Sequence, residues 1–205
     1  MSGPARTRFT VEARRQQIVD AMRKVVLERG LRETRVQDVA TKLGISSGLI
    51  HYHFATKEEL TEAMLRESAA DSLADAKKSL ASLPSAEARL VKLLDTYYLP
   101  SSRRDPWWVL WIDFWGEALR DDALRRISED LDNAWVELTA EVIAEGVAAG
   151  TFHSADPLES AWRLCALLDG LALQVVLHER TMTRAQMRRH GRRAAALELG
   201  FELPH

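Results

Sequence analysis

The sequence predicts an all-α fold, with a small N-terminal helix-turn-helix domain of three helices followed by a larger C-terminal helical domain. Apolar residues recur at helical spacing along the chain, and the alternating pattern typical of strands is not found over any useful length. Capping residues, Gly and Pro divide the chain into short helices before residue 57 and longer helices after it. We therefore expect domains at residues 1–56 and 57–205.

Composition narrows the class of protein. A chain of 205 residues can bury a substantial core, and a single Cys excludes an intrachain disulfide, which fits a reducing compartment. The first residues contain no apolar run of the signal-peptide kind. The most apolar region, residues 161–177, is interrupted by Arg163 and Asp169 and is short for a membrane span. These features predict a cytoplasmic protein without a membrane segment.

Charge is unevenly distributed along the chain. Residues 1–57 hold 11 Lys and Arg against 5 Asp and Glu, whereas residues 58–205 hold 17 against 25. A basic N-terminal part on an acidic body indicates that the first domain meets a polyanion.

Local signals set the expected helices. Thr34 and Thr56 each begin a capping box, with Gln37 and Glu59 as partner residues, and Ser46 or Ser47 can cap a short helix that ends at His53. Gly30, Gly44, Pro84, Pro100, Pro106, Gly150 and Pro157 provide the breaks between helices. The expected helices are residues 11–29, 34–43, 47–53, 57–83, 86–99, 106–119, 122–149, 157–180 and 184–199.

Residues 34–53 have the pattern of a helix-turn-helix. Val39 in the first helix, Ile45 in the turn and either Leu49 or Ile50 in the second helix can share one apolar contact, and Gly44 allows a sharp turn. The second helix of such a unit lies in the major groove of DNA, with its N-terminal residues at the bases.

Polar side chains and one glycine lie where this geometry places contacts to DNA. Hydroxyl and free N–H groups at a helix N-terminus suit phosphate, glycine allows close backbone approach, and Tyr, His and Lys donate to phosphate oxygens. The candidate DNA-binding residues are Thr34, Ser46, Ser47, Gly48, His51, Tyr52, His53 and Lys57. For His51, a partly buried position remains an alternative. A basic arm that includes Arg6 and Arg8 would enter the adjacent minor groove.

Other chemistry is not indicated. His51 and His53 are two residues apart on a helix and point about 200° apart, so they cannot share one metal ion. The chain has no H-E-x-x-H motif and no phosphate-binding Gly loop, and Cys165 stands in an apolar helix. We therefore expect no enzyme, and hence no catalytic residue, metal or cofactor.

The helix-turn-helix segment also resembles a known family. Residues 34–60, TRVQDVATKLGISSGLIHYHFATKEEL, resemble the DNA-binding domain of TetR-type transcriptional regulators. The resemblance rests on Thr34, Ala40, the turn GIS, Gly48, the HF pair and KEEL, while His51 stands where the family usually has Tyr. It covers residues 10–65 well and the remainder by architecture. WIDFWGEALRDDAL and ALLDGLALQ are similar to the betaine-synthesis-repressor-like subgroup.

The resemblance implies a homodimer whose two heads bind the half-sites of a palindromic double-stranded DNA operator, with a small-molecule effector in the body. Helix 157–180 is apolar nearly all round and fits a subunit interface, and a central helix of a monomeric bundle is the alternative. We expect a repressor that its ligand releases from DNA. An activator, or a dimeric DNA-binding protein without an effector, would be the alternative function.

A tryptophan stripe is the candidate ligand site. Trp108, Trp111 and Trp115 share one face of the helix DPWWVLWIDFWGEAL, and Trp162 and Asp169 lie on the apolar helix. Aromatic faces beside a carboxylate can bind an organic cation. The same stripe could instead pack the helix against the core or a partner. A cavity above roughly 300 Å³ lined by Trp111, Trp115 and Trp162 would favour control by a ligand.

Overall fold

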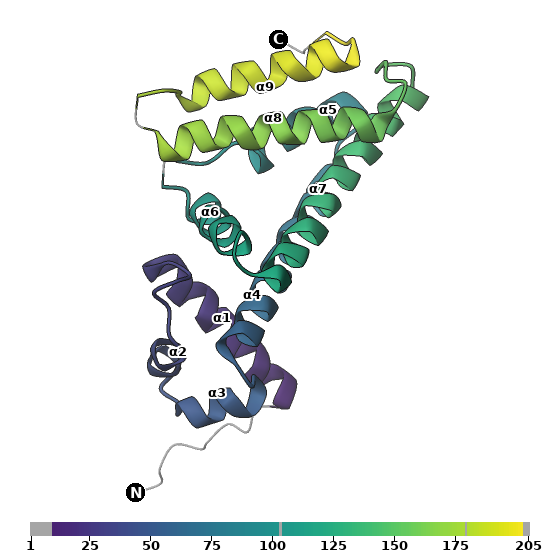
Figure 1. The fold of residues 1–205 in the computed structure, drawn as a ribbon. Coiled ribbons are helices and arrows are strands. Elements are labelled where there is room, and N and C mark those ends of the chain that lie inside the picture. Colours follow the sequence, from purple (N-terminus) through teal and green to yellow (C-terminus); the bar gives the residue numbers. More distant parts are fainter. Residues whose placement is uncertain (1–9, 103, 179, 203–205) are drawn as a thin grey trace, which may run out of the picture. The chain divides into compact units, whose positions relative to one another are not determined.

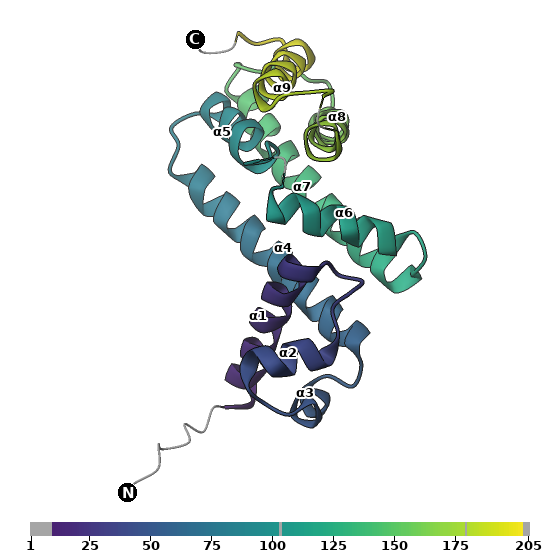
Figure 2. The ribbon, with the colours of Figure 1, turned by 90° about the vertical axis from the view of Figure 1, so that its left-hand side faces the viewer.

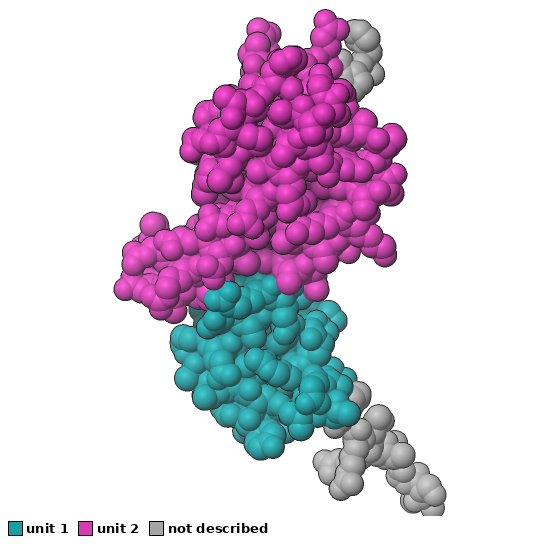
Figure 3. Space-filling view, turned by 90° about the vertical axis from the view of Figure 1, so that its right-hand side faces the viewer, with its two compact units in different colours: residues 1–68 teal, residues 69–205 magenta. Residues whose placement is uncertain are grey.

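The structure is a computed structural model that describes residues 10–102, 104–178 and 180–202. Within these residues it contains nine α-helices, one π-helix and no strand, so the prediction of an all-α fold is confirmed. The chain divides into two compact units, one up to Ser68 and the other from Ala69 onward (Figure 3). The division falls inside α4 (Lys57–Ala81), whereas the sequence placed a boundary at the start of this helix.

The first unit contains α1 (Val11–Arg29), α2 (Val36–Leu43), α3 (Ser47–His53) and the beginning of α4 (Figure 1). Helices as short as α2 and α3 are marginal alone, so burial of apolar side chains must hold them. The buried side chains of this unit include Ile18, Val19, Met22, Val39, Ile50, Phe54, Leu60 and Met64. The burial of Leu60 and Met64 explains why the unit continues past residue 57.

The turn between α2 and α3 depends on Gly44. Its φ of 64° lies in the left-handed region that favours glycine. The N–H of Ile45 donates to the carbonyl oxygen of Ala40 at 3.1 Å and closes α2. Ser46 then caps α3, because its hydroxyl oxygen accepts from the N–H of Leu49 at 3.2 Å.

The start of α2 differs from the sequence prediction. The helix begins at Val36, and the Asp38 carboxylate accepts from the N–H of Arg35 at 2.9 Å. Thr34 is turned into the fold, where its hydroxyl donates to the carbonyl oxygen of Gly30 at 2.8 Å. The capping box predicted from Thr34 is therefore wrong, and this hydroxyl joins the end of α1 to the loop before α2.

The second unit is built around α7. Its elements are α5 (Ala86–Lys92), the π-helix η1 (Leu93–Tyr97), α6 (Pro106–Ala118), α7 (Asp122–Ala148), α8 (Pro157–Leu177) and α9 (Arg184–Leu199). α7 packs against α5, α6 and α8, and α9 lies beside α8 (Figure 1 and Figure 2). Asp105, Asp121 and Asp156 begin α6, α7 and α8, because each carboxylate accepts from two N–H groups of the first turn.

The helix predicted at residues 86–99 is interrupted. Its α-helical part ends at Lys92, and a π-helix follows in which the N–H of Tyr98 donates to the carbonyl oxygen of Leu93 at 3.2 Å. A π-turn holds more residues than an α-turn, so it changes the direction of the side chains that follow. Tyr97 and Tyr98 consequently both reach one cavity.

The apolar residues of α8 lie on two faces of the helix that differ in exposure. One side is buried, with Leu164, Cys165 and Leu168 in the core, while the other leaves Trp162 43% and Leu177 55% exposed in the single chain. Of the helices in the described ranges, α8 is long and apolar enough to span a membrane by length and composition. Its packing against α7 and α9 accounts for the same apolar sequence.

Candidate functional site

The first turn of α3 presents backbone and hydroxyl groups at the surface. Ser46 and Gly48 are exposed, and the hydroxyl of Ser47 contacts the side-chain oxygen of Gln37. A Cβ on Gly48 would meet nothing nearer than the Oγ of Ser46 at 3.9 Å, so packing within the chain does not require a glycine here. The missing side chain leaves this turn open to close approach by a partner.

Ring side chains end the same helix. Tyr52 is 75% exposed, His51 is also exposed, and His53 is half-buried. The rings of Tyr52 and His53 meet edge to face, with their centroids 5.1 Å apart. The exposure of His51 excludes the partly buried position that the sequence left open. Because folding buries so little of the Tyr52 ring, this ring is available for contact with another molecule.

Lys57 and Thr34, two of the expected DNA contacts, make hydrogen bonds within the protein. The Nζ of Lys57 donates to the carbonyl oxygens of Leu31 and Arg32 at 3.3 and 3.4 Å, which joins the start of α4 to the loop before α2. Thr34 has no exposed surface. The structure therefore contradicts a phosphate contact by Thr34, because its hydroxyl is buried and already bonded. The arm residues Arg6 and Arg8 lie outside the described residues.

The turn also has a spacing known from hydrolases. Gly44 to Gly48 read Gly-Ile-Ser-Ser-Gly, which fits the Gly-x-Ser-x-Gly motif of a nucleophile elbow. That motif needs a strand before the serine, whereas α2 precedes Ser46 here. The Ser46 oxygen acts as a helix cap, so the spacing reflects the turn between two helices.

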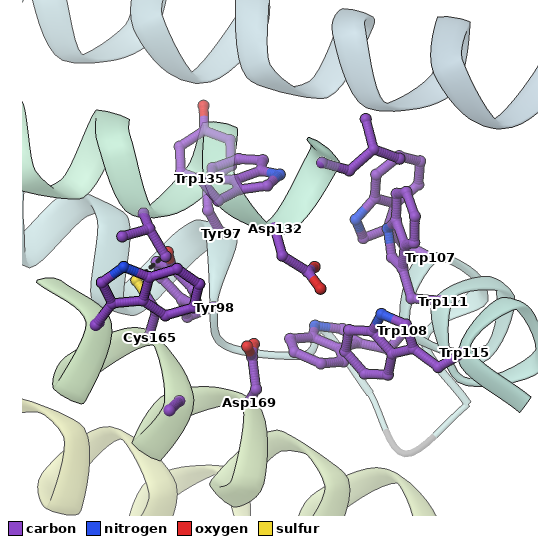
Figure 4. Close-up of a pocket in the computed structure, with 14 residues that line it drawn as sticks. Tyr97, Tyr98, Trp107, Trp108, Trp111, Trp115, Asp132, Trp135, Cys165 and Asp169 are labelled. Atoms are coloured by element: carbon purple, nitrogen blue, oxygen red, sulfur yellow. Dashed lines mark hydrogen bonds between the residues drawn. The ribbon is translucent and has the colours of Figure 1, made fainter. Parts of the chain in front are cut away.

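A cavity in the second unit is lined by all six tryptophans of the chain (Figure 4). α6 contributes four of them, Trp135 comes from α7, and Trp162 comes from α8. The other lining side chains include Tyr97, Tyr98, Leu131, Asp132, Val136, Cys165 and Asp169. Helices far apart in the sequence therefore build one aromatic wall.

The tryptophans of α6 hold one another in place. The ring centroids of Trp107 and Trp111 lie 5.2 Å apart at an interplanar angle of 79°. Those of Trp108 and Trp115 lie 6.3 Å apart at 70°. Edge-to-face pairs of this kind favour a defined ring orientation, so the wall is organised before any ligand arrives.

The opposite wall combines aromatic rings with a hydrogen-bonded group. The ring centroid of Trp135 lies 5.7 Å from that of Tyr97 and 6.1 Å from that of Tyr98. The hydroxyl of Tyr98 lies 2.9 Å from the Sγ of Cys165 and 3.2 Å from the Oγ1 of Thr139. Burial raises the pKa of Tyr98 well above its usual value and that of the Cys165 thiol to about 11, so both groups are neutral near pH 7.

Two carboxyl groups supply the charge of this cavity. Figure 4 shows Asp132 and Asp169 between the α6 tryptophans and the wall formed by Trp135 and Tyr98. Burial, and then the nearby charge of Asp132, raise the pKa of Asp169 to about 7. Burial also raises the pKa of Asp132, which keeps contact with solvent. Among the described residues, no Lys, Arg or His lines the cavity, so no basic side chain balances this charge, and the Asp132 carboxylate accepts one hydrogen bond from the hydroxyl of Ser128 at 3.4 Å.

The size of the cavity limits its ligand. Its volume is about 170 Å³, so it does not reach the roughly 300 Å³ that was expected of a regulator controlled by a ligand. A dry cavity of about 150 Å³ holds benzene, so this one suits a molecule with few heavy atoms. Trp108 also packs with Leu99, Val175 and Met187. The tryptophan stripe therefore both completes the core and lines the cavity, which combines the two interpretations of the sequence.

The five residues expected at a ligand site all line this cavity, namely Trp108, Trp111, Trp115, Trp162 and Asp169. Five further lining residues were not predicted from the sequence, namely Trp107, Trp135, Asp132, Tyr97 and Tyr98. Asp132 and Trp135 are three residues apart in DLDNAW, a spacing that places them on one helix face. This signal was present, but which neighbour the face meets depends on helix packing.

Known protein families match both units. The family described as "Bacterial regulatory proteins, tetR family" matches residues 18–64, and "BetI-type transcriptional repressor, C-terminal" matches residues 86–200. The HTH-type transcriptional regulator BetI of Burkholderia mallei is 30% identical over 167 residues, which cover 81% of this chain and 83% of the relative. Its Escherichia coli counterpart is 27% identical over 170 residues, with coverages of 80% and 83%.

Solved structures share the arrangement of helices. A transcriptional regulator from Saccharomonospora viridis in complex with choline has a TM-score of 0.81 and 28% identity, covering 92% of this chain and 98% of that one. A TetR-family regulator from Rhodococcus sp. has a TM-score of 0.76 and 28% identity, with coverages of 91% and 98%.

A helix-turn-helix unit followed by a helical body with a cavity defines a class of DNA-binding regulators. The chain belongs to the tetR family of bacterial regulatory proteins, and its C-terminal part is of the BetI type. It is a DNA-binding transcriptional regulator, and the relatives that it matches are regulators rather than enzymes.

Proposed function

We propose that the chain is a homodimeric repressor that leaves a palindromic operator when a small organic cation occupies the tryptophan-lined cavity. The observation that carries this proposal is the cavity wall, which combines six tryptophans and two carboxyl groups with no basic side chain among the described residues. Tryptophan offers the best aromatic face for a cation. An anion would be repelled, and a neutral apolar molecule would leave the carboxyl groups desolvated without a partner.

The size and the relatives narrow the class of cation. A volume of about 170 Å³ suits a quaternary ammonium group with a short substituent. The Saccharomonospora viridis regulator in complex with choline, at 28% identity over 92% of this chain, supports the same class. We infer that the effector is choline or a methylated ammonium ion of similar size.

For DNA, α3 is the element that would enter the major groove. The retained contact set is Ser46, Ser47, Gly48, His51, Tyr52, His53 and Lys57. The open first turn and the exposed Tyr52 ring support this set. Lys57 is half-buried and donates to two carbonyl oxygens, and an ammonium group at this place can also contact a phosphate.

The exposed apolar face of α8 and α9 supports a homodimer. Leu197 is 75% exposed, and a groove between these helices is lined largely by apolar side chains such as Leu167, Leu171 and Met182. A contiguous apolar surface of this kind marks an interaction site. A second copy would cover it with the same surface in a two-fold arrangement. Light scattering should then give twice the chain mass of 23.1 kDa.

Helix α4 provides a route by which the ligand can act on DNA binding. Its residues up to Ser68 belong to the first unit, and those from Ala69 belong to the second. We propose that the cation binds best to an arrangement of the dimer in which the spacing of the two heads no longer fits the operator. A ligand with such a preference lowers the affinity for DNA by linkage.

We propose that the protein acts in the cytoplasm.

The test of this proposal asks whether release from DNA requires the positive charge of the ligand or only its shape. A labelled fragment of the DNA upstream of the gene is bound to the protein, and fluorescence anisotropy follows its release by choline, tetramethylammonium or uncharged 3,3-dimethylbutan-1-ol. We expect release by both cations and not by the neutral analogue of choline. Release by the neutral analogue alone would contradict a cation site. Lack of release by any of the three would favour a dimer without this effector, and a reporter gene would separate repression from activation.

A further inference from the structure

The two carboxyl groups of the cavity come from different helices and share one aromatic enclosure. Asp132 lies on α7 and keeps contact with solvent, and Asp169 lies on α8 and is half-buried. Figure 4 places both side chains in the space between Trp108, Trp115 and Trp135. Two carboxylates in such a place repel each other, so a single proton is bound more easily than at an isolated carboxyl group.

No other group of the described wall can take over this proton. The remaining titratable groups are Tyr97 and Tyr98 at the end of the π-helix and Cys165 on α8, while α6 contributes four tryptophans. Tyr98 and Cys165 are held neutral by burial, as their raised pKa values show. The carboxyl pair therefore controls the charge of the cavity near neutral pH.

We propose that the Asp132–Asp169 pair binds a singly charged organic cation in exchange for one proton, so that effector affinity depends on pH. This inference rests on the proposed cation site and adds its charge balance. In the empty cavity below neutral pH, Asp169 carries the proton and Asp132 is ionised. When the cation enters, the proton leaves to solvent and both carboxylates face the cation. Asp169 is then the residue that determines how strongly the cavity attracts one positive charge.

The direction of the effect follows from linkage. Burial and Asp132 raise the pKa of Asp169 to about 7 in the empty cavity. A bound cation favours the ionised carboxylate and lowers this pKa, so full affinity is present above pH 7 and is lost as the pH falls below it. For one proton, the dissociation constant should rise about tenfold between pH 8.5 and pH 6.0.

Calorimetry of the intact protein with tetramethylammonium and choline tests this inference. Neither quaternary ammonium group titrates, so any pH dependence must come from the protein. Titrations at pH 6.5 in two buffers of different ionisation enthalpy should show release of about three-quarters of a proton per cation. In Asp169→Asn the affinity should be flat between pH 6.5 and 8.5 and the proton release should vanish. Circular dichroism and urea unfolding of the Asp169→Asn protein provide the control for folding.

The outcomes separate this inference from the proposed function. Cation binding with a tenfold pH effect and proton release supports the exchange. Cation binding that is independent of pH and releases no proton overturns the exchange and leaves the cation site intact. If neither cation binds between pH 6 and 8.5, the exchange and the proposed effector class both fail. A pH effect that persists unchanged in Asp169→Asn would also overturn the role of Asp169.

Discussion

The hydroxyl of Tyr98 lies 2.9 Å from the Sγ of Cys165, and both groups are buried in the wall of the tryptophan-lined cavity. The π-helix before Tyr98 brings its ring to this position, and α8 brings the thiol. The buried hydroxyl and thiol bond to each other, whereas the two carboxyl groups of the cavity have no basic partner in the described wall.

Cys165 should be a slow nucleophile whose reactivity follows pH. Burial raises its pKa to about 11, so at pH 8 its thiolate fraction is roughly two hundredfold below that of a free thiol. Labelling of the native protein with Ellman's reagent should therefore be slow and accelerate about tenfold per pH unit between pH 8 and pH 10. The denatured protein, which contains this one Cys, should react at once. A slow rate without pH dependence would show that access, not ionisation, limits the reaction.

Trp111→Leu should weaken binding of choline. The substitution removes one aromatic face while it keeps an apolar side chain, so the loss should be about 0.5–2 kcal/mol, or roughly 2- to 30-fold in affinity. Val109→Ala, on the exposed face of the same helix, is the matched control and should bind choline as the wild type does. Calorimetry measures both variants. Equal binding by the Trp111→Leu variant and the wild type would exclude Trp111 from the cation site.

Gly48→Ala should separate stability from DNA binding. No atom of the chain opposes a methyl group there, so the free energy of unfolding should stay the same or rise by about 0.5–1 kcal/mol. The methyl group would obstruct close approach of α3 to DNA, and we expect at least a tenfold loss of affinity, about 1.4 kcal/mol. Gly116→Ala in α6 meets the same free space and should leave DNA binding unchanged. Urea unfolding and anisotropy would measure the two effects, and unaltered DNA binding by Gly48→Ala would remove α3's first turn from the interface.

Lys57→Ala should weaken binding to every DNA sequence by a similar factor. Loss of one phosphate contact lowers the slope of log affinity against log salt by about 0.9. Lys77→Ala removes an exposed charge from the part of α4 in the second unit and serves as the control. Fluorescence anisotropy across a salt series measures the affinity and the salt slope of both variants with operator and random DNA. A changed sequence preference with an unchanged slope would show that Lys57 reads a base instead.

The helix-turn-helix was predictable because its signals are local. Gly44 permits the left-handed turn, Ser46 caps the next helix, and Ile50 supplies a buried contact. Thr34 shows the limit of such signals. Its spacing to Gln37 fits a capping box, but the Asp38 carboxylate instead accepts from the N–H of Arg35, one residue after Thr34. The Thr34 hydroxyl donates to the carbonyl oxygen of Gly30. Two capping patterns competed, and burial of the Thr34 side chain decided between them.

The sequence by itself determined the all-helical class and most helices, though not the start of α2 or the π-helix. It also determined the tryptophan stripe of α6 and the aromatic and acidic residues of α8, because helical spacing relates residues a few positions apart. Only the tertiary structure decided that Asp132 lies in the same cavity as Asp169, on a different helix. The tertiary structure also brings Tyr97 and Tyr98 to that cavity through the π-helix. It places no basic side chain in the described wall that would compensate the charge of the carboxyl groups. Contacts between distant segments depend on how whole helices pack, and local patterns do not contain that information.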